Sequence, residues 1–184
     1  MAQLEKGAPA QKEGRAPQEL RCYELLDRLG LEYWRVDHPV TDTMEACREI
    51  DTVLGAATCK NLFLCNRQET DFYLLLIPGD KVFKTKDLSK QIGSARLSFA
   101  SGDAMEKYLD LRPGSCSLLG LMNDRGNAVR LLVDEDVLKE DWIGLHPCRN
   151  TTTLKLRRED LFEKVLPATG HTMTIVHLEA PAEP

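Results

Sequence analysis

The chain has 184 residues, of which 42% are hydrophobic and 29% charged, and its formal net charge is −5. This composition is typical of one globular domain with a sizeable core, and no apolar run reaches the roughly 20 residues that a membrane helix needs. The negative charge argues against an extended interface with DNA or long RNA, because such proteins usually carry a basic footprint.

The two ends of the chain differ in composition from the middle. Residues 1–16 are rich in Ala, Gln, Lys, Glu, Gly and Pro and lack the apolar segment of a secretory signal, so we expect a disordered tail. A second tail is expected at 179–184, with a single domain at 17–178. The six cysteines lack metal-binding spacing, which favours reduced thiols in a cytoplasmic protein that binds no metal. Whether Cys59 or Cys148 is sensitive to oxidation stays open.

Periodicity predicts the elements of the first half of the chain. Apolar residues at helical spacing predict a helix at 17–29, and a strand at 32–38 follows. Asp42 and Glu45 suggest a capping box for a helix at 43–54.

Two nearly continuous apolar runs, 61–65 and 72–77, predict central strands that are covered on both faces. Further helices are expected at 85–92, 102–110 and 158–166, and further strands at 118–122, 128–133, 142–146, 152–156 and 172–178. This mixed order of helices and strands predicts an α+β domain.

Lys60 stands at the entrance of the first apolar strand, beside Asn61. A lysine there is commonly a solvated flank or a gatekeeper of a sheet edge. It is also a point charge with three donors, suited to a phosphate or an ester, and Asn61 adds both a donor and an acceptor.

The loop Pro113-Gly114-Ser115-Cys116-Ser117-Leu118-Leu119-Gly120 connects an expected helix to an expected strand. It is either a plain turn or a loop whose backbone N–H groups approach a ligand closely. No GxSxG motif surrounds its serines, which argues against a serine nucleophile.

His146 ends an apolar strand and is followed by a polar run that contains Asn150. A lone histidine is commonly structural, but this one could hydrogen-bond a ribose or an amino acid, and His38 repeats the pattern more weakly. Basic residues gather at 80–96 and at 149–158, as solvated faces or as contacts to a small piece of RNA.

The order of these motifs is more specific than any one of them. The segments concerned are Lys60–Leu64, Arg96–Ser101, Pro113–Ser115, Gly120–Asp124, His146-Pro147 with Asn150–Thr152, Asp37–Pro39 and Met44–Ala46. Together they resemble the YbaK/prolyl-tRNA synthetase editing-domain family over about residues 18–178, and within it the free-standing deacylases of alanyl-tRNA(Pro).

The resemblance implies a mixed, partly closed β-sheet surrounded by helices, and a hydrolase that deacylates mischarged tRNA(Pro) without a metal, another cofactor or a covalent nucleophile. It implies that Lys60 binds the terminal phosphate and ribose, that the Gly-Ser loop forms the aminoacyl pocket and that His146 closes the opposite wall. The partner would be the acceptor end of tRNA(Pro), with prolyl-tRNA synthetase as a transient partner, and neither DNA nor a membrane.

The candidate residues fall into three groups. They are Lys60, Asn61 and His146 for catalysis; His38, Gly114, Ser115, Cys116, Ser117, Gly120 and Asn150 for substrate binding; and Lys81, Lys84, Lys86 and Arg149 for tRNA binding.

One departure from the family concerns substrate choice. Many members carry Pro-Phe where this chain has Leu118-Leu119, near the expected pocket. Since one methylene changes binding by only about 1–3 kcal/mol, alanine is preferred but cysteine, serine and threonine stay open. The alternative to an enzyme is a catalytically silent module that binds tRNA or an amino acid. The joint presence of Lys60, the Gly-Ser loop and His146 favours the enzyme.

Overall fold

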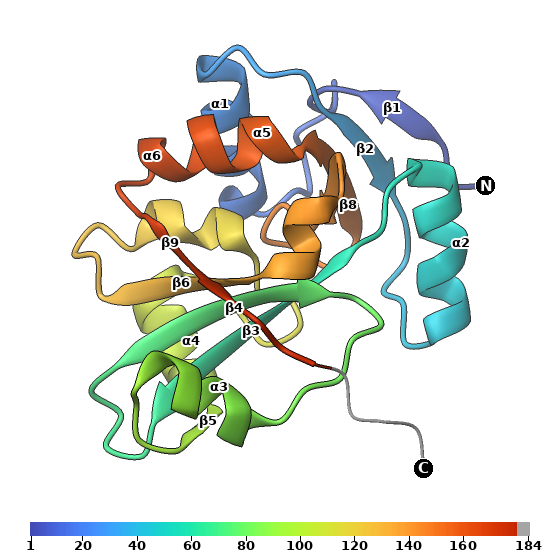
Figure 1. Cartoon of the computed structure of the whole chain (residues 1–184). Helices are drawn as coiled ribbons and strands as arrows, with labels where there is room; N and C mark the ends of the chain where they lie inside the picture. The colour runs from blue at the N-terminus through green and yellow to red at the C-terminus, as the bar shows by residue number, and fades with distance from the viewer. Residues whose placement is uncertain (180–184) are drawn as a thin grey trace.

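The computed structural model describes residues 1–179 and contains two β-sheets with helices packed around them (Figure 1). The first sheet is antiparallel throughout. Its strands, in spatial order, are β1 (Leu4–Lys6), β2 (Trp34–Asp37), β8 (Thr152–Arg157) and β7 (Trp142–Leu145).

The second sheet is mixed, which confirms the expected α+β class. β3 pairs antiparallel with both of its neighbours, whereas β4, β6 and β9 are parallel to one another. Its strands, in spatial order, are β5 (Leu97–Phe99), β3 (Cys59–Asn66), β4 (Phe72–Pro78), β6 (Val129–Asp134) and β9 (Met173–Val176).

Helices lie close to where the periodicity predicts them. The regular ones are α1 (Pro17–Arg28), α2 (Met44–Leu54), α3 (Thr85–Ile92) and α4 (Gly102–Leu109). A continuous helical stretch at 158–168 combines α5 (Arg158–Asp160), a π-helical turn (Leu161–Val165) and α6 (Leu166–Ala168). Two 3-10 helices, Leu118–Asn123 and Glu135–Lys139, complete the described chain.

Strand β4 is buried on both faces, as its continuous apolar run predicts. Leu74 and Leu76 belong to the main core, which also contains residues of α1. Leu75 and Ile77 belong to a second core with Leu88 of α3. Alternating side chains of one strand therefore serve two cores, which is why the sequence shows no polar alternation there.

The two sheets meet at the start of β3. Thr58 bridges Gly144 of β7, and the Gly144 amide donates to the carbonyl of Ala57 over 3.0 Å. A Cβ at Gly144 would lie only 3.0 Å from the Ala57 oxygen, so a residue without a side chain permits the approach of the two sheets. Within the five-stranded sheet, a Cβ at Gly79 would lie 2.4 Å from the Thr58 oxygen, where the end of β4 passes the start of β3.

Two predictions about local structure are wrong, and one strand was not predicted. Residues 118–122 form a 3-10 helix instead of a strand, because Ser117 accepts a hydrogen bond from the Leu119 amide and starts a helical turn. Helix α2 is capped by Thr43, which accepts from the Ala46 amide, and not by Asp42. Strand β5 was not predicted, since its three residues are too few for a periodic signal.

The N-terminal segment is ordered, contrary to the expected disordered tail. β1 pairs with β2, the Gly7 amide donates to the Tyr33 carbonyl, and Arg15 forms an ion pair with Asp37. Partners far along the chain order this polar segment, and its composition does not reveal them. Residues 180–184, most of the expected C-terminal tail, lie outside the described residues. None of the helices within 1–179 is long and apolar enough to cross a bilayer.

Candidate active site

A cleft of about 970 Å³ opens where the two sheets meet. Its walls come from α2, the beginning of β3, the end of β4, the Gly-Ser loop and the segment from Asp136 to His146. Five of the residues singled out in the sequence line it: Lys60, Asn61, Gly114, Cys116 and His146.

Lys60 is the second residue of β3, so it lies within the strand and not before it. Its side chain is half-buried, and its Nζ donates to the Lys81 carbonyl over 2.9 Å. No carboxylate of residues 1–179 lies within ion-pair distance of this ammonium group. Since an ammonium has three N–H donors, Lys60 offers two donors and a full positive charge to a ligand in the cleft.

Asn61 and Ser117 fix the Gly-Ser loop against β3 and His146. The Asn61 Oδ1 accepts from the Leu118 amide at 2.7 Å, and the buried Ser117 hydroxyl donates to the His146 carbonyl at 2.6 Å. Ser117 is fully buried and does not line the cleft, so its role is to position the loop and the histidine and not to bind substrate.

The ring of His146 is held in one tautomer. Its Nδ1 lies 2.8 Å from the Thr152 carbonyl, which can only accept, so Nδ1 carries the proton and Nε2 has a lone pair. Burial, reinforced by the neighbouring His38 ring, lowers the pKa of His146, although its bond to the Thr152 carbonyl opposes the shift. Near pH 7 the ring is therefore neutral, and Nε2 is an acceptor at the cleft.

His38 supports the site from behind instead of binding a ligand. Its Nδ1 lies 2.7 Å from the Pro39 carbonyl and its Nε2 lies 2.8 Å from the Thr153 hydroxyl, so both nitrogens are occupied. The ring is buried, lies outside the cleft lining and is 6.2 Å from the His146 ring.

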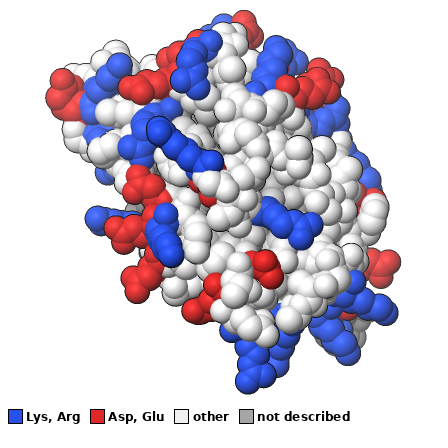
Figure 2. All heavy atoms as spheres, turned by 90° about the vertical axis from the view of Figure 1, so that its left-hand side faces the viewer, with Lys and Arg blue, Asp and Glu red and all other residues white. Residues whose placement is uncertain are grey.

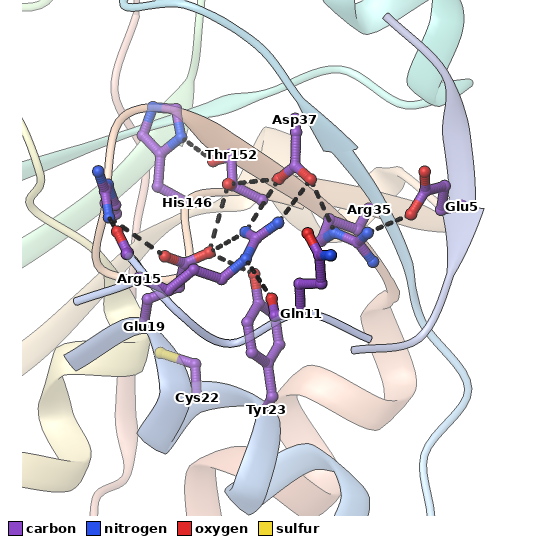
Figure 3. A network of polar contacts seen from close by, with 12 residues as sticks. Glu5, Gln11, Arg15, Glu19, Cys22, Tyr23, Arg35, Asp37, His146 and Thr152 are labelled. Carbon is purple, nitrogen blue, oxygen red and sulfur yellow. Dashed lines mark hydrogen bonds and ion pairs between the residues drawn. The ribbon is translucent and has the colours of Figure 1, made fainter. Parts of the chain in front are cut away.

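A partly buried polar network lies beneath His146 (Figure 3). Arg15 bridges Glu19 and Asp37, with N–O distances of 2.6 and 2.8 Å. Asp37 also accepts from the Thr152 hydroxyl at 2.8 Å, and the carbonyl of Thr152 accepts from His146. Burial opposes ionisation of Asp37, but the hydrogen bonds from Arg15 and Thr152 outweigh it and lower the pKa of Asp37 to about 2.

The Gly-Ser loop contributes only part of itself to the cleft. Gly114 has a φ of +89°, a conformation that favours glycine, and the Asn150 amide group packs beside it. Ser115 and Asn150 are half-buried and do not line the cleft. Gly120 lies against Leu111, where a Cβ would come within 2.7 Å of Leu111 Cδ1, so this glycine serves packing.

Leu118 and Leu119 are fully buried and belong to the main core. Neither of them lines the cleft. The departure from the family's Pro-Phe pair therefore changes the support behind the loop and not the wall that a ligand touches.

Two cysteines of the cleft, Cys59 and Cys116, are poor nucleophiles. Burial raises the pKa of both Cys59 and Cys116 to about 12, so both thiols are protonated near pH 7. The described residues contain no group of His, Cys, Asp or Glu arranged to hold a metal ion.

The expected tRNA-binding residues divide into two pairs. Lys81 is held by Asp134 and Asp136 at 2.6 and 2.7 Å, and Arg149 donates to the Gly14 carbonyl and lies near Glu19. Lys84 and Lys86, in contrast, are exposed at the start of α3. Two of the four expected tRNA-binding residues, Lys81 and Arg149, are thus held or approached by acidic residues far away in the sequence.

On the surface shown in Figure 2, acidic and basic side chains lie among large uncharged areas, and basic ones are more frequent along its lower edge. This mixed pattern agrees with the small negative net charge and gives no extended basic footprint on that side.

Several residues of the cleft carry no signal in the sequence. Trp142 and Arg48 are single residues in ordinary segments, and only the fold brings them together. Phe99 belongs to the Arg96–Ser101 motif, but its exposure of 65% and its place in the cleft are known only from the structure.

The chain matches the family model of the aminoacyl-tRNA editing domain over residues 38–164. It is 35% identical over 153 residues to the prolyl-tRNA editing protein ProX of Acetoanaerobium sticklandii, covering 83% of this chain and 93% of that protein. It is 33% identical over 171 residues to the prolyl-tRNA synthetase associated domain-containing protein 1 of Mus musculus, covering 89% and 99%.

Solved structures agree at the level of the fold. A candidate trans-editing enzyme for prolyl-tRNA synthetase superposes with a TM-score of 0.65 at 16% identity, over 89% of this chain and 98% of that one. The match to the family model and the identity to curated relatives confirm the resemblance predicted from the motifs. The chain belongs to the aminoacyl-tRNA editing domain family and is an aminoacyl-tRNA deacylase.

Proposed function

We propose that this protein removes alanine from mischarged tRNA(Pro) by hydrolysing the aminoacyl ester at the 3′ end. One observation carries the proposal: Lys60 and His146 line the same cleft, one with free N–H donors and the other with a free lone pair. The family match supports the reaction, and the name of the ProX relative supports the tRNA.

Each of the two residues has a role that suits an aminoacyl ester. The Lys60 ammonium binds the phosphate and ribose of the terminal nucleotide, where a point charge is effective. The Nε2 atom of His146 accepts a hydrogen bond from the attacking water or from the ribose hydroxyl beside the ester. Asn61 acts through the loop, because its side chain is bound to the Leu118 amide.

Hydrolysis then needs little more than positioning. The water oxygen forms a bond to the carbonyl carbon, the bond from that carbon to the ribose oxygen breaks, and the proton of the water passes to the ribose oxygen. The amides of Gly114 and Cys116, which donate to no acceptor in the described chain, would stabilise the oxyanion. No covalent intermediate is required, since the ester is already activated.

The floor of the cleft supports alanine as the substrate. Phe63 and Met105 line the cleft although they are only 2% and 9% exposed. Ala100, which follows Phe99 in the sequence, lines it as well. This floor is apolar and offers a serine or threonine hydroxyl no side-chain partner. Such a pocket discriminates against a hydroxyl only about 100-fold, so cysteine, serine and threonine are the competitors to test.

The partner we propose is the acceptor end of tRNA(Pro), and not a long stretch of RNA. Lys84 and Lys86 are the exposed cations of the expected set and are free to contact phosphates. Prolyl-tRNA synthetase is proposed as a transient partner, in line with the name of the mouse relative. The competing function, a silent module that binds tRNA without turnover, lacks a specific observation in its favour.

The test is deacylation of alanyl-tRNA(Pro) by the wild type and by Lys60→Ala, with prolyl-, cysteinyl-, seryl- and threonyl-tRNA(Pro) in parallel. We expect loss of alanine to be fastest and to slow at least about 100-fold in Lys60→Ala, because the charged group that positions the terminal nucleotide, and with it the ester, is removed. The matched control is Lys164→Ala, since Lys164 pairs with Asp160 on the helical stretch and does not line the cleft.

Each other outcome leads to a different conclusion. Faster release of another amino acid retains the reaction and replaces the substrate. Binding of tRNA(Pro) without release of any amino acid establishes the silent module. Equal rates in Lys60→Ala and the wild type show that Lys60 has no catalytic role.

A further inference from the structure

Two tryptophans and three cations form a line across one face of the four-stranded sheet. Lys6 pairs with Trp34 and Trp34 pairs with Lys155, while Trp142 pairs with Arg157. Paired residues of neighbouring strands lie on the same face, as do residues two apart in one strand. We call these five residues the indole stripe.

The stripe is built from cation–π contacts. The two indole rings meet edge to face, with centroids 5.4 Å apart. The Lys155 Nζ lies 4.7 Å from the Trp142 centroid and 5.5 Å from that of Trp34, the Arg157 guanidinium lies 4.5 Å from Trp142, and the Lys6 Nζ lies 5.6 Å from Trp34. Each cation is thus oriented by an aromatic ring.

An aromatic ring orients a cation without neutralising it. Lys6 has a carboxylate partner, Glu32, at 3.5 Å, but both of these side chains are more than 60% exposed. Within residues 1–179, Lys155 and Arg157 form no ion pair with a carboxylate. Lys155 also packs at Gly55, the C-cap of α2, where the helix dipole favours a cation. The stripe therefore carries net positive charge on an acidic protein.

The stripe is continuous with the active-site cleft. Trp142 lines the cleft and belongs to the stripe, and it opens the strand that leads to His146. His146 is four positions after Trp142 in extended chain, a span of about 13 Å. Side chains of the stripe are exposed or half-buried, so a ligand can reach them.

From this geometry we propose that the indole stripe binds the RNA strand that leads to the aminoacylated 3′ end. Lys155 and Arg157 contact its phosphates, and a base stacks on the exposed guanidinium or on the edge of the indole pair. Single-stranded RNA is recognised by this combination of cations with aromatic or guanidinium planes. The inference rests on the proposed function, because it extends the substrate from the terminal nucleotide to the strand before it.

The test compares the wild type with the double variant Lys155→Gln/Arg157→Gln. We expect the Kd for uncharged tRNA(Pro) to rise about tenfold, and the KM for alanyl-tRNA(Pro) to rise with it at nearly constant kcat. The slope of log Kd against log salt concentration should fall by about 1.4, since each phosphate contact with a single strand contributes about 0.7. Hydrolysis of 3′-alanyl-adenosine, which lacks the preceding strand, should be unchanged.

The matched control removes two other cations that lie over aromatic rings. Lys107 lies 5.1 Å from the Tyr108 centroid and Arg130 lies 5.5 Å from that of Tyr73, and neither lines the cleft. Lys107→Gln/Arg130→Gln should retain the wild-type Kd and salt slope. Lys155→Arg keeps the charge and the contact with the ring, so it should bind tRNA(Pro) like the wild type. Wild-type binding by this variant would show that the loss in the Gln variants does not come from a folding defect at this position.

A Kd and a salt slope equal to those of the wild type in Lys155→Gln/Arg157→Gln would overturn the inference. An equal loss in the control pair would overturn it as well, because the effect would then be general electrostatics. The binding measurements need no turnover, so they test whether the indole stripe binds RNA even if deacylation is absent. Normal deacylation with unchanged binding would overturn the stripe and leave the proposed function in place.

Discussion

The two sheets differ in what surrounds them. The five-stranded sheet has apolar side chains on both faces of β4 and acts as a scaffold. The four-stranded sheet is flanked by an ionic network on one side (Figure 3) and by the indole stripe on the other. The comparison teaches that burial of apolar side chains stabilises the five-stranded sheet. The site, in contrast, is positioned by a small number of polar contacts, each of which a single substitution can remove.

The largest effect on stability is expected within the scaffold. Leu75 is fully buried in the second core, so Leu75→Ala should lower the free energy of unfolding by about 2–5 kcal/mol. Urea denaturation measures the loss, and the deacylation rate per folded molecule should stay near that of the wild type. A large loss of activity in the folded protein would show that scaffold and site are not separable.

A smaller loss of stability with a larger loss of function is expected from Ser117→Ala. The change leaves the buried His146 carbonyl without its donor, which costs about 1–3 kcal/mol. It also removes the hydrogen bond that positions the Gly-Ser loop against His146, so kcat should fall about tenfold. Ser115→Ala is the matched control, because this neighbouring serine makes no side-chain hydrogen bond within the described chain. Equal kcat values for the two variants would contradict the positioning role of Ser117.

The smallest effect concerns the pH dependence of the polar network. The pKa of Asp37 is about 2 in the folded protein, below its ordinary value of 3.8, so ionisation favours folding. This contribution is fully present above pH 3.8 and is lost as the pH falls toward 2. It amounts to about 1 kcal/mol after allowance for screening, since 42% of the side chain is exposed.

Urea denaturation of the wild type and Asp37→Asn at pH 7 and pH 2.5 measures this contribution. The difference between the two proteins should be larger at pH 7. A difference that does not change between the two pH values would mean that the network contributes through packing and not through charge.

The scaffold could be predicted from the sequence because its signals are local. The apolar runs of β3 and β4 and the helical spacing of α1 are each contained in one short segment. Two of the errors occur where a distant partner takes part. The charged segment Leu4–Lys6 becomes a strand because β2 pairs with it, and the apolar run at 118–122 becomes a 3-10 helix because Ser117 and Asn61 bind its first turn.

The same distinction explains the candidate site. Lys60, Asn61 and His146 were predicted as one site from motif order, and all three line the cleft. The prediction for Lys81 overlooked Asp134, which lies 53 residues further along the chain and holds the lysine ammonium. Nothing in the sequence indicates that Trp142 lines the cleft, because this depends on the meeting of two sheets.

The glycine at the meeting of the two sheets has a consequence for the shape of the cleft. Gly144 carries no Cβ at a point where one would lie 3.0 Å from backbone atoms of Ala57 and Thr58, so the two sheets meet through bare backbone. A methyl group at this position would press on the backbone of the other sheet. The width of the cleft at this point therefore depends partly on a residue that has no side chain with which to touch the substrate.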